Sequence, residues 1–180
     1  MADLQGATSE FHDEYGETLT IEFRKLQDAL LSDTIVALVA PEPIRFTEAA
    51  VIDDAIRAML AEDRVAVVIV DGDDRLIGIV TDRDLLGRCW SGRDGGGTRL
   101  SEVMTRDPET LKSDDRICYA VNRMMAMSCR TVPVVDAERR PIGIVTVDDI
   151  VKWLAGIFPE AILNLRPGDR LKHPGEPDGG

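Results

Sequence analysis

The sequence has few cysteines and histidines, which limits the chemistry it can support. Its 180 residues include three cysteines, an odd number with no C-x-x-C pair, so the sequence predicts no disulfide framework. The two histidines, His12 and His173, lie in terminal segments that we expect to be disordered. A histidine base or a histidine-ligated metal is therefore not expected.

The sequence also lacks a long apolar run and an excess of basic residues. The longest purely apolar stretch, Val65–Val70, is far shorter than the roughly 20 residues that span a bilayer. The N-terminus is polar and acidic, unlike a secretory signal. With 33 acidic and 21 basic residues the formal net charge is −12, which weighs against general binding to nucleic acid or anionic membranes. We expect a cytoplasmic protein that binds neither nucleic acid nor membranes.

An internal repeat is the strongest signal in the chain. Shifting the sequence by 65 residues aligns Pro43–Asp84 with Pro108–Asp149 without a gap, and 15 of the 42 aligned pairs are identical. The hydrophobic fraction of 44% and the length suit two small units that share a core. Because one copy is too small to bury its apolar face alone, the repeat predicts a pseudo-symmetric pair.

Each copy predicts the same order of elements: a lead-in segment, a helix, two strands and a second helix. The first helices are expected over Thr47–Glu62 and Ser113–Met127, with Thr47 and Ser113 as N-caps. Their apolar faces would bury Leu60 and Met125, and Met127 is expected to pack in the core. The predicted strands are VAVVIV, LIGIV, TVPVV and PIGIV, and the second helices run from Asp82 to about Trp90 and from Val147 to about Phe158. Strands that are apolar throughout indicate an α/β (α+β) fold, in which a small sheet is covered by helices on one face and shielded on the other.

Composition predicts where the two units begin and end. We expect an N-terminal segment over 1–33, partly disordered with a helix over Ile21–Leu31, a first unit over 34–92, a glycine-rich linker over 93–98, a second unit over 99–157 and a tail over 158–180. The stretch SGRDGGGT could cradle a phosphate, but the Walker pattern needs a following Gly-Lys-Ser/Thr, and Thr-Arg-Leu follows. A flexible linker is the favoured interpretation.

The sequence motifs GIVTDRDLL and GIVTVDDIV share a threonine and an aspartate. Packing of a hydrophobic core does not require these two polar residues. In the structural interpretation, Thr81 with Asp84, and Thr146 with Asp149, form capping boxes at the starts of the second helices. Capping alone would accept Ser, Asn or Asp at the first position and would favour Glu or Gln at the second.

A ligand-binding interpretation uses the same geometry. A strand that ends at a helix N-terminus presents unpaired backbone N–H groups to a phosphate, and the threonine hydroxyl adds another donor. The aspartate carboxylate suits the two hydroxyls of a ribose. One residue pair can serve both purposes, so both interpretations stay open.

These phrases, their helix–strand–strand–helix context and the stretch VMTRDPETLKSDD resemble the CBS (cystathionine β-synthase) domain, which occurs in tandem as a Bateman module. The resemblance covers roughly Thr34 to Leu154. The ending FPEAILNL also resembles the C-terminal segment of stand-alone bacterial proteins of this type. The CBS resemblance implies two clefts that bind adenosine derivatives such as AMP, ADP, ATP or S-adenosylmethionine, and it implies regulation instead of catalysis. It also implies a homodimer paired through the second helices, near Trp90, Trp153 and Phe158.

The resemblance carries a set of binding residues over to this chain. Thr81 and Asp84 would serve one cleft, and Thr146 and Asp149 the other. Contacts to the base would come from the lead-in segments and first strands, which here supply Ile44, Thr47, Ala66, Thr110, Lys112, Arg130 and Thr131.

The two phrases differ at one position that matters for charge, because Arg83 in the first corresponds to Asp148 in the second. Arg83 could donate to a phosphate, whereas Asp148 would repel it unless a divalent cation lies between. Arg130 could partly compensate in the second cleft. The alternative is that both side chains point to solvent.

Three other functions are weighed against ligand binding. Cys129 beside Arg130 could be a reactive thiol, although a small apolar residue at a strand edge is the favoured interpretation. The acidic pairs Asp82/Asp84 and Asp148/Asp149 could bind Mg²⁺, but we expect no obligatory cofactor and Mg²⁺ only together with a nucleotide. The third alternative is a structural or partner-binding module with vestigial clefts, and an unidentified protein partner is expected in either case.

Overall fold

The computed structural model describes residues 21, 24–38, 42–89 and 97–157. Predictions for the first 20 residues, for most of the glycine-rich segment and for the tail from residue 158 fall outside the described residues. Residues 24–32 are helical, which agrees with the helix predicted near the N-terminus. The elements that follow are η1 Ile35–Ala37, β1 Arg45–Thr47, α2 Ile52–Ala61, β2 Ala66–Val70, β3 Leu76–Thr81, α3 Asp82–Cys89, α4 Leu100–Val103, β4 Thr105–Arg106, β5 Leu111–Lys112, α5 Ile117–Ala126, β6 Thr131–Val135, β7 Pro141–Thr146 and α6 Val147–Ile157.

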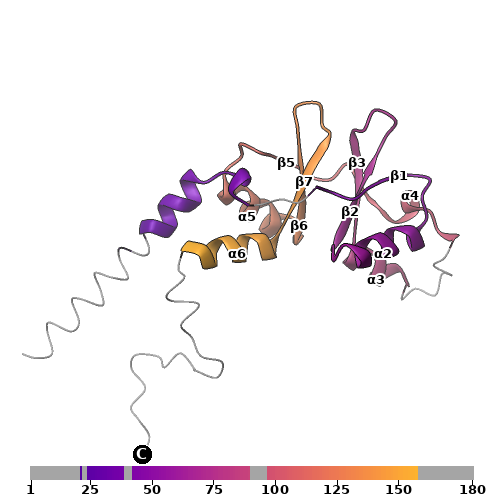
Figure 1. Cartoon of the computed structure of the whole chain (residues 1–180), viewed down its shortest axis with the longest axis horizontal. Helices are drawn as coiled ribbons and strands as arrows, with labels where there is room; N and C mark the ends of the chain where they lie inside the picture. The colour runs from indigo at the N-terminus through magenta and orange to yellow at the C-terminus, as the bar shows by residue number, and fades with distance from the viewer. Residues whose placement is uncertain (1–20, 22–23, 39–41, 90–96, 158–180) are drawn as a thin grey trace, which may run out of the picture.

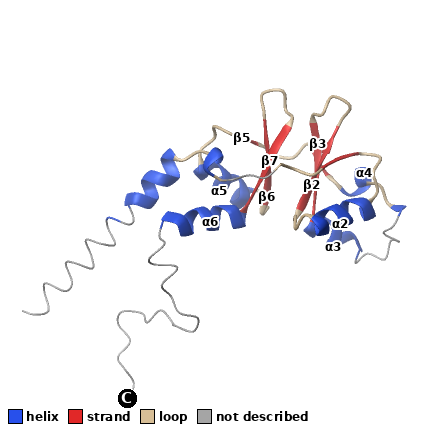
Figure 2. Ribbon diagram, viewed as in Figure 1, coloured by secondary structure: helices blue, strands red, loops and turns tan. Residues whose placement is uncertain are grey.

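Two small sheets face each other at the centre, and helices cover their outer faces (Figures 1 and 2). The first sheet has the order β1-β2-β3-β4, and the second has the order β5-β6-β7. In each, a short strand pairs in parallel with the first strand of an antiparallel hairpin. Helices α2 and α3 lie outside the first sheet, and α5 and α6 lie outside the second. The predicted α/β (α+β) fold with two helix-covered units is confirmed.

The predicted hairpin strands and second helices agree with β2, β3, β6, β7, α3 and α6 to within about a residue. The predicted starts of the first helices are wrong. Thr47 ends strand β1, Ser113 lies in a turn after β5, and the N-caps of α2 and α5 are Val51 and Arg116. The lead-in segments gain more by pairing their backbone with the edges of β2 and β6 than by extending the helices.

The lead-in segments of the two copies are exchanged between the units. Thr34 opens the first copy but pairs with Arg116 of the second, whereas Arg99 opens the second copy and pairs with Val51 of the first. The exchange reaches the interior, because Ile35 packs in the core of the second unit and Leu100 in the core of the first. Each unit is therefore completed by a segment that the sequence assigns to the other copy.

The N-terminal side of this exchange is tied by polar contacts as well as packing. The Trp153 indole N–H on α6 donates to Asp33 at 3.0 Å, and the Asp33 carbonyl accepts the Ile117 N–H at 3.0 Å. Arg116 donates to the carbonyls of Leu31 and Ser32. Trp153 is half-buried and packs against the second core, so its ring serves packing within one chain.

A third cluster of buried side chains joins the two sheets. Val68 and Leu76 from the first sheet meet Val135 from the second, and Ile144 packs against them. Across the described residues every buried side chain of the core is apolar, and no helix there is long and apolar enough to cross a membrane. The two units thus share an interior, as the repeat predicted.

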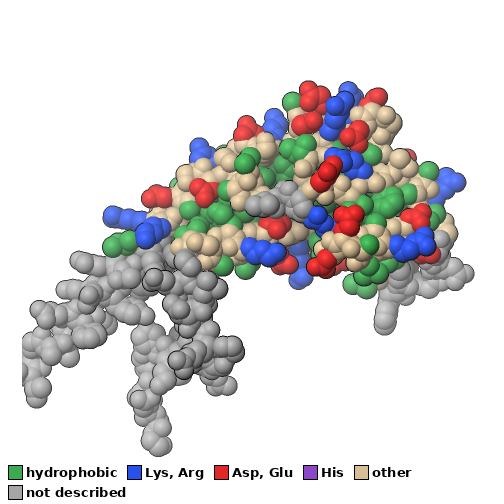
Figure 3. Space-filling model, in the orientation of Figure 1, with side chains coloured by type: hydrophobic (Ala, Val, Ile, Leu, Met, Phe, Trp, Pro, Cys, Tyr) green, Lys and Arg blue, Asp and Glu red, His purple; other side chains and the backbone are tan. Residues whose placement is uncertain are grey.

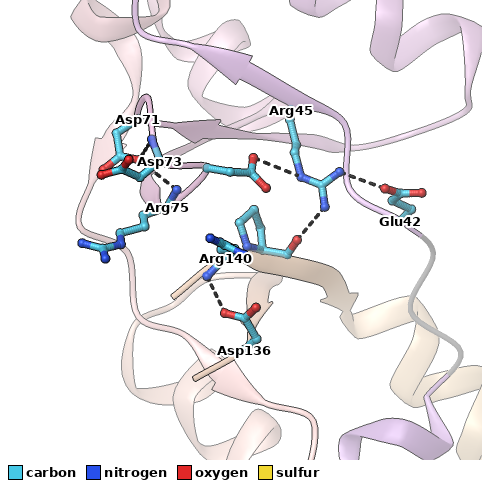
Figure 4. Close-up of polar contacts among 9 residues, drawn as sticks. Glu42, Arg45, Asp71, Asp73, Arg75, Asp136 and Arg140 are labelled. Carbon is cyan, nitrogen blue, oxygen red and sulfur yellow. Dashed lines mark hydrogen bonds and ion pairs between the residues drawn. The ribbon is translucent and has the colours of Figure 1, made fainter. Parts of the chain in front are cut away.

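Arginines bind the units together at the end where the hairpins turn. Arg45 donates to the Pro141 carbonyl at 2.9 Å, and Arg139 donates to the Leu76 carbonyl at 3.2 Å. Leu76 and Pro141 are equivalent first residues of β3 and β7, so each unit satisfies a carbonyl of the other. Arg45 also pairs with Glu42 at 2.9 Å (Figure 4), and side chains of both charges gather over this end (Figure 3).

The hairpin turns are built alike in both units. Asp71 accepts the N–H groups of Asp73 and Arg75, each at 2.9 Å, and Asp136 accepts the N–H of Arg140 at 2.7 Å (Figure 4). Asp136 also accepts the N–H of Glu138, at 3.0 Å. The N–H of Arg75 is the main cause that lowers the pKa of the Asp71 carboxyl below its ordinary value, because these bonds favour the charged form.

Gly78 provides a test of how closely the exchanged segment packs. A Cβ at this position would lie 2.5 Å from Met104 Sδ and 3.3 Å from the Thr105 carbonyl oxygen. We expect Gly78→Ala to lower the free energy of unfolding by about 1–3 kcal/mol through overpacking, measured as a lower urea midpoint at constant m-value.

Gly72→Ala is the matched control, because a Cβ there meets nothing within 4 Å. It should be neutral or should stabilise by up to about 1 kcal/mol. Equal midpoints for the two variants would show that Met104 does not pack against β3 as described.

Candidate functional site

The first strand–helix turn, Thr81–Asp84, joins β3 to α3. The Thr81 N–H donates to Asp84 Oδ2 at 2.9 Å, and the Thr81 hydroxyl donates to the same oxygen at 2.7 Å. In return, the Asp84 N–H donates to Thr81 Oγ1 at 3.3 Å. This reciprocal set is a capping box, so the structural interpretation of the pair is confirmed for the first unit.

The second strand–helix turn, Thr146–Asp149, has the same bonds at 2.8, 2.7 and 3.2 Å. In both turns capping uses only Oδ2 of the aspartate. Among the described residues, Oδ1 of Asp84 and of Asp149 accepts no hydrogen bond, and both side chains are half-buried. Capping therefore leaves one carboxylate oxygen in each turn for another donor.

Each turn lies beside the start of a neighbouring strand. Ala66 pairs with Thr81, and the Val65 carbonyl accepts the Asp82 N–H at 2.9 Å. In the second unit Thr131 pairs with Thr146, and the Arg130 carbonyl accepts the Val147 N–H at 3.0 Å. The structure thus places Ala66, Arg130 and Thr131 next to the turns.

Of the four predicted residues in the lead-in segments, two lie near the strand–helix turns and two lie far from them. The Ile44 carbonyl accepts the Val68 N–H, and Thr110 directly precedes β5, so both stand within about two residues of the strand starts. Thr47 pairs with Val70 and Lys112 with Val135, four residues further along β2 and β6. At a rise of about 3.3 Å per residue, that is roughly 13 Å from the turns.

The side chains near the turns point into the space between the sheets. Successive residues of a strand face opposite sides, and Val67, Val80, Val132 and Val145 pack in the cores on the helix side. Ala66, Thr81, Thr131 and Thr146 alternate with them and therefore face the opposite sheet.

Arg83 and Asp148 occupy equivalent positions and lie in exposed first turns. Arg83 Nη1 donates to the Ser128 carbonyl, in the turn between α5 and β6, at 3.3 Å. This is a contact between the two units that the sequence did not reveal. Its partner is a backbone atom 45 residues away, which no motif encodes.

The other candidate chemistry gains no support from the structure. Cys118 and Cys129 are half-buried free thiols, and Cys129 packs against the second core. No group of three or more potential metal ligands forms within the described ranges. The expectation that Met125 and Met127 pack in the core is wrong, since their exposed fractions are 76% and 59%; Leu60, at 79%, is exposed as well.

A hollow of about 480 Å³ is lined by no residue of either turn. It is lined by Glu109, Asp115, Tyr119, Asn122, Arg123, Ala126 and Met127, on the outer side of α5. It contains none of the predicted site residues and no helix N-terminus, and Arg123 is already paired with Glu109 across it. The unpaired N–H groups predicted at the start of α3 are not found, because those of Asp82, Arg83 and Asp84 all donate within the protein. The strand–helix turns do hold both repeated threonines and both unused carboxylate oxygens, so we retain them as the candidate site.

Known proteins share this architecture. The solved CBS domain pair of protein MJ0100, in complex with 5′-methylthioadenosine and S-adenosyl-L-methionine, is 27% identical, has a TM-score of 0.63, and is matched over 69% of this chain and 97% of its own. The CBS domain protein PAE2072 from Pyrobaculum aerophilum, complexed with AMP, shares the fold at 20% identity, with a TM-score of 0.63 and coverage of 71% and 99%.

One curated relative is a much longer enzyme. A homoserine O-acetyltransferase from Methanohalobium evestigatum is 32% identical over 125 residues, which are 69% of this chain but 25% of that enzyme. The chain thus spans about a quarter of that relative's length. The CBS domain family matches residues 35–91 and 100–156, more than half of the sequence. The chain therefore belongs to the CBS domain family and contains a tandem pair of these domains.

Proposed function

We propose that this CBS pair is a regulatory module that binds an adenosine-containing ligand, such as AMP, ADP, ATP or S-adenosylmethionine, at its two strand–helix turns. One observation carries the proposal: both turns place a threonine and a half-buried aspartate with one unused carboxylate oxygen at a helix N-terminus. The complex of the MJ0100 pair, a relative of similar extent, supports the class of ligand.

We assign each group a role in binding. The unused Oδ1 of Asp84 or Asp149 would accept a ribose hydroxyl while Oδ2 continues to cap the helix. In the first turn the Arg83 guanidinium would face a phosphate, since the backbone N–H groups of that turn already donate within the protein. At the start of α6 the Asp148 N–H would face an electron-rich group of the ligand. Ala66, and Thr110 with Thr131, would border the base, whereas the Ile44 side chain packs against the first core. We leave Thr47 and Lys112 out of the proposed site, because their strands carry them to the far end of the sheets.

The two turns should differ in the charge they accept. Arg83 brings a cation to the first turn, whereas Asp148 brings an anion to the second. The first turn would therefore favour phosphorylated ligands. The second would favour a neutral or cationic derivative or a Mg²⁺-bound nucleotide, with Arg130 offsetting part of the charge.

The module would act through a partner and not through catalysis of its own. The described residues contain no group of three or more potential metal ligands. The candidate turns hold a helix cap and a carboxylate, and neither turn contains a histidine or a cysteine. The expected cytoplasmic location and an unidentified protein partner belong to this proposal. The alternative, a structural module with vestigial sites, rests on the fact that capping alone accounts for every observed bond of Thr81 and Asp84.

Asp84→Ala and Asp149→Ala test ligand binding. Each should weaken binding at its own turn by about 1.5–3 kcal/mol, through loss of a charge-assisted hydrogen bond to the ribose. Isothermal calorimetry with AMP, ADP, ATP and S-adenosylmethionine measures this. Binding should also raise the melting temperature of the wild-type protein, because a ligand at ~100 times its Kd stabilises the folded state by roughly 2.7 kcal/mol.

Asp82→Ala is the matched control, because it removes a carboxylate from the first turn of α3 without removing the proposed ribose acceptor. It should leave S-adenosylmethionine affinity within about two-fold, the scale of an exposed charge. Folded Asp84→Ala/Asp149→Ala protein with undiminished affinity would show that the aspartates only cap.

We also propose that two copies pair through the outer helices. Equivalent apolar residues are exposed in both units: Leu60 and Met125 at 79% and 76%, and Leu86 and Val151 at 72% and 55%. A set of exposed apolar side chains that recurs in both copies is typical of an interface. The predicted interface role of Trp153 is not supported, because that ring packs within its own chain. Trp90 and Phe158 lie outside the described residues.

Light scattering at tens of micromolar should therefore give the mass of a dimer. Leu86→Glu with Val151→Glu should shift it toward a monomer, since burying two unpaired carboxylates at the interface is costly. Arg140→Glu, in the exposed hairpin turn away from the outer helices, is a charge-changing control. A wild-type monomer would refute the dimer.

A further inference from the structure

The contact between Arg83 and Ser128 crosses from one unit to the other at the end of the molecule opposite the hairpins. Arg83 lies in the first turn of α3, and Ser128 lies in the turn that leads into β6. The direction of the Ser128 carbonyl is set by its backbone, which has a φ of 51°. The N–H groups of Ser128 and Cys129 bond to Met125 and Met124, at 3.3 and 3.1 Å, and hold that turn in place.

The repeat shows that this contact has no counterpart on the other side. The position equivalent to Ser128 is Asp63, which has the same φ of 51°. The position equivalent to Arg83 is Asp148, whose side chain cannot donate to a carbonyl when ionised. The fold therefore offers two equivalent places for such a tie, and the sequence makes it at one.

We propose that Arg83 is a ligand-displaceable tie between the two units. This rests on the proposed function, because it requires a ligand with a phosphate at the start of α3. A hydrogen bond from a guanidinium to a phosphate is stronger than one to a neutral carbonyl, and Arg83 is exposed and free to turn. A phosphorylated ligand at the first turn withdraws Arg83 from Ser128, whereas an unphosphorylated ligand leaves the tie in place.

Release of the tie would be felt at the second turn. Ser128 is followed within three residues by Arg130 and Thr131, both of which border the second proposed site. A phosphorylated ligand at the first turn thus loosens the segment 128–131, which must be ordered for the second ligand to bind. This couples the two sites without a large movement of either sheet.

The test measures hydrogen exchange of the Ser128 and Cys129 amides in wild-type protein, in Arg83→Met and in Arg57→Met. Arg57 is the matched control, because it is an exposed helical arginine that pairs only with Asp54 of its own helix among the described residues. In the free protein, Arg83→Met should exchange about two- to three-fold faster than the other two, the scale of a weak exposed hydrogen bond.

Saturating AMP, confirmed by calorimetry, should raise wild-type exchange at these amides to the Arg83→Met level. It should leave Arg83→Met itself unchanged, and saturating adenosine should not accelerate exchange in wild type. If AMP binds while exchange stays constant or slows, the tie is not displaced and the proposal falls, although nucleotide binding stands. If calorimetry detects no AMP binding, the proposed function fails first and the displaceable tie fails with it.

Discussion

The reciprocal exchange of lead-in segments is the constraint on which the rest of the structure depends. Ile35 completes the second core and Leu100 the first, so neither unit has a complete interior without the other. Burial of a side chain of this size stabilises by about 1.5–3 kcal/mol, and each exchanged segment also brings backbone pairing. The two strand–helix turns are consequently held on one shared scaffold. A ligand at either turn acts on a body that cannot separate into independent halves.

Much of this fold could be predicted from the sequence, because the relevant signals are local. The apolar strands, their polar hairpin turns and the helices that begin at Asp82 and Val147 are all encoded in short stretches of sequence. The starts of α2 and α5 were misplaced because Thr47 and Ser113 are good N-caps in isolation. Pairing of β1 with β2, a contact between segments about 20 residues apart, outweighs that preference. The exposure of Leu60 and Met125 could not be predicted either. Helical periodicity shows which face of a helix is apolar, but it does not show how far the sheet extends along that face.

The candidate site illustrates a different limit. The repeated Thr and Asp located both turns correctly, and the capping bonds explain part of their presence. Sequence alone could not separate capping from ligand binding, because both need an acceptor at the same helix N-terminus. The structure narrows the question to a single atom in each turn. Oδ2 is committed to the cap, so any ligand must be bound by Oδ1 and by the side chains around the turn.

Pseudo-symmetry explains why the differences between the copies are informative. The turns at Asp63 and Ser128 share a left-handed backbone, and the caps at Thr81 and Thr146 share their bonds, so the scaffold itself treats the two ends alike. A duplicated scaffold gives equivalent positions the same surroundings, and side chains then decide what each position does. At the hairpin end the ties are reciprocal, with Arg45 and Arg139 each satisfying a carbonyl of the other unit. At the opposite end, Arg83 reaches across and Asp148 cannot. The molecule is therefore closed symmetrically at one end and asymmetrically at the end where the proposed ligands bind, which is the arrangement that lets one site influence the other.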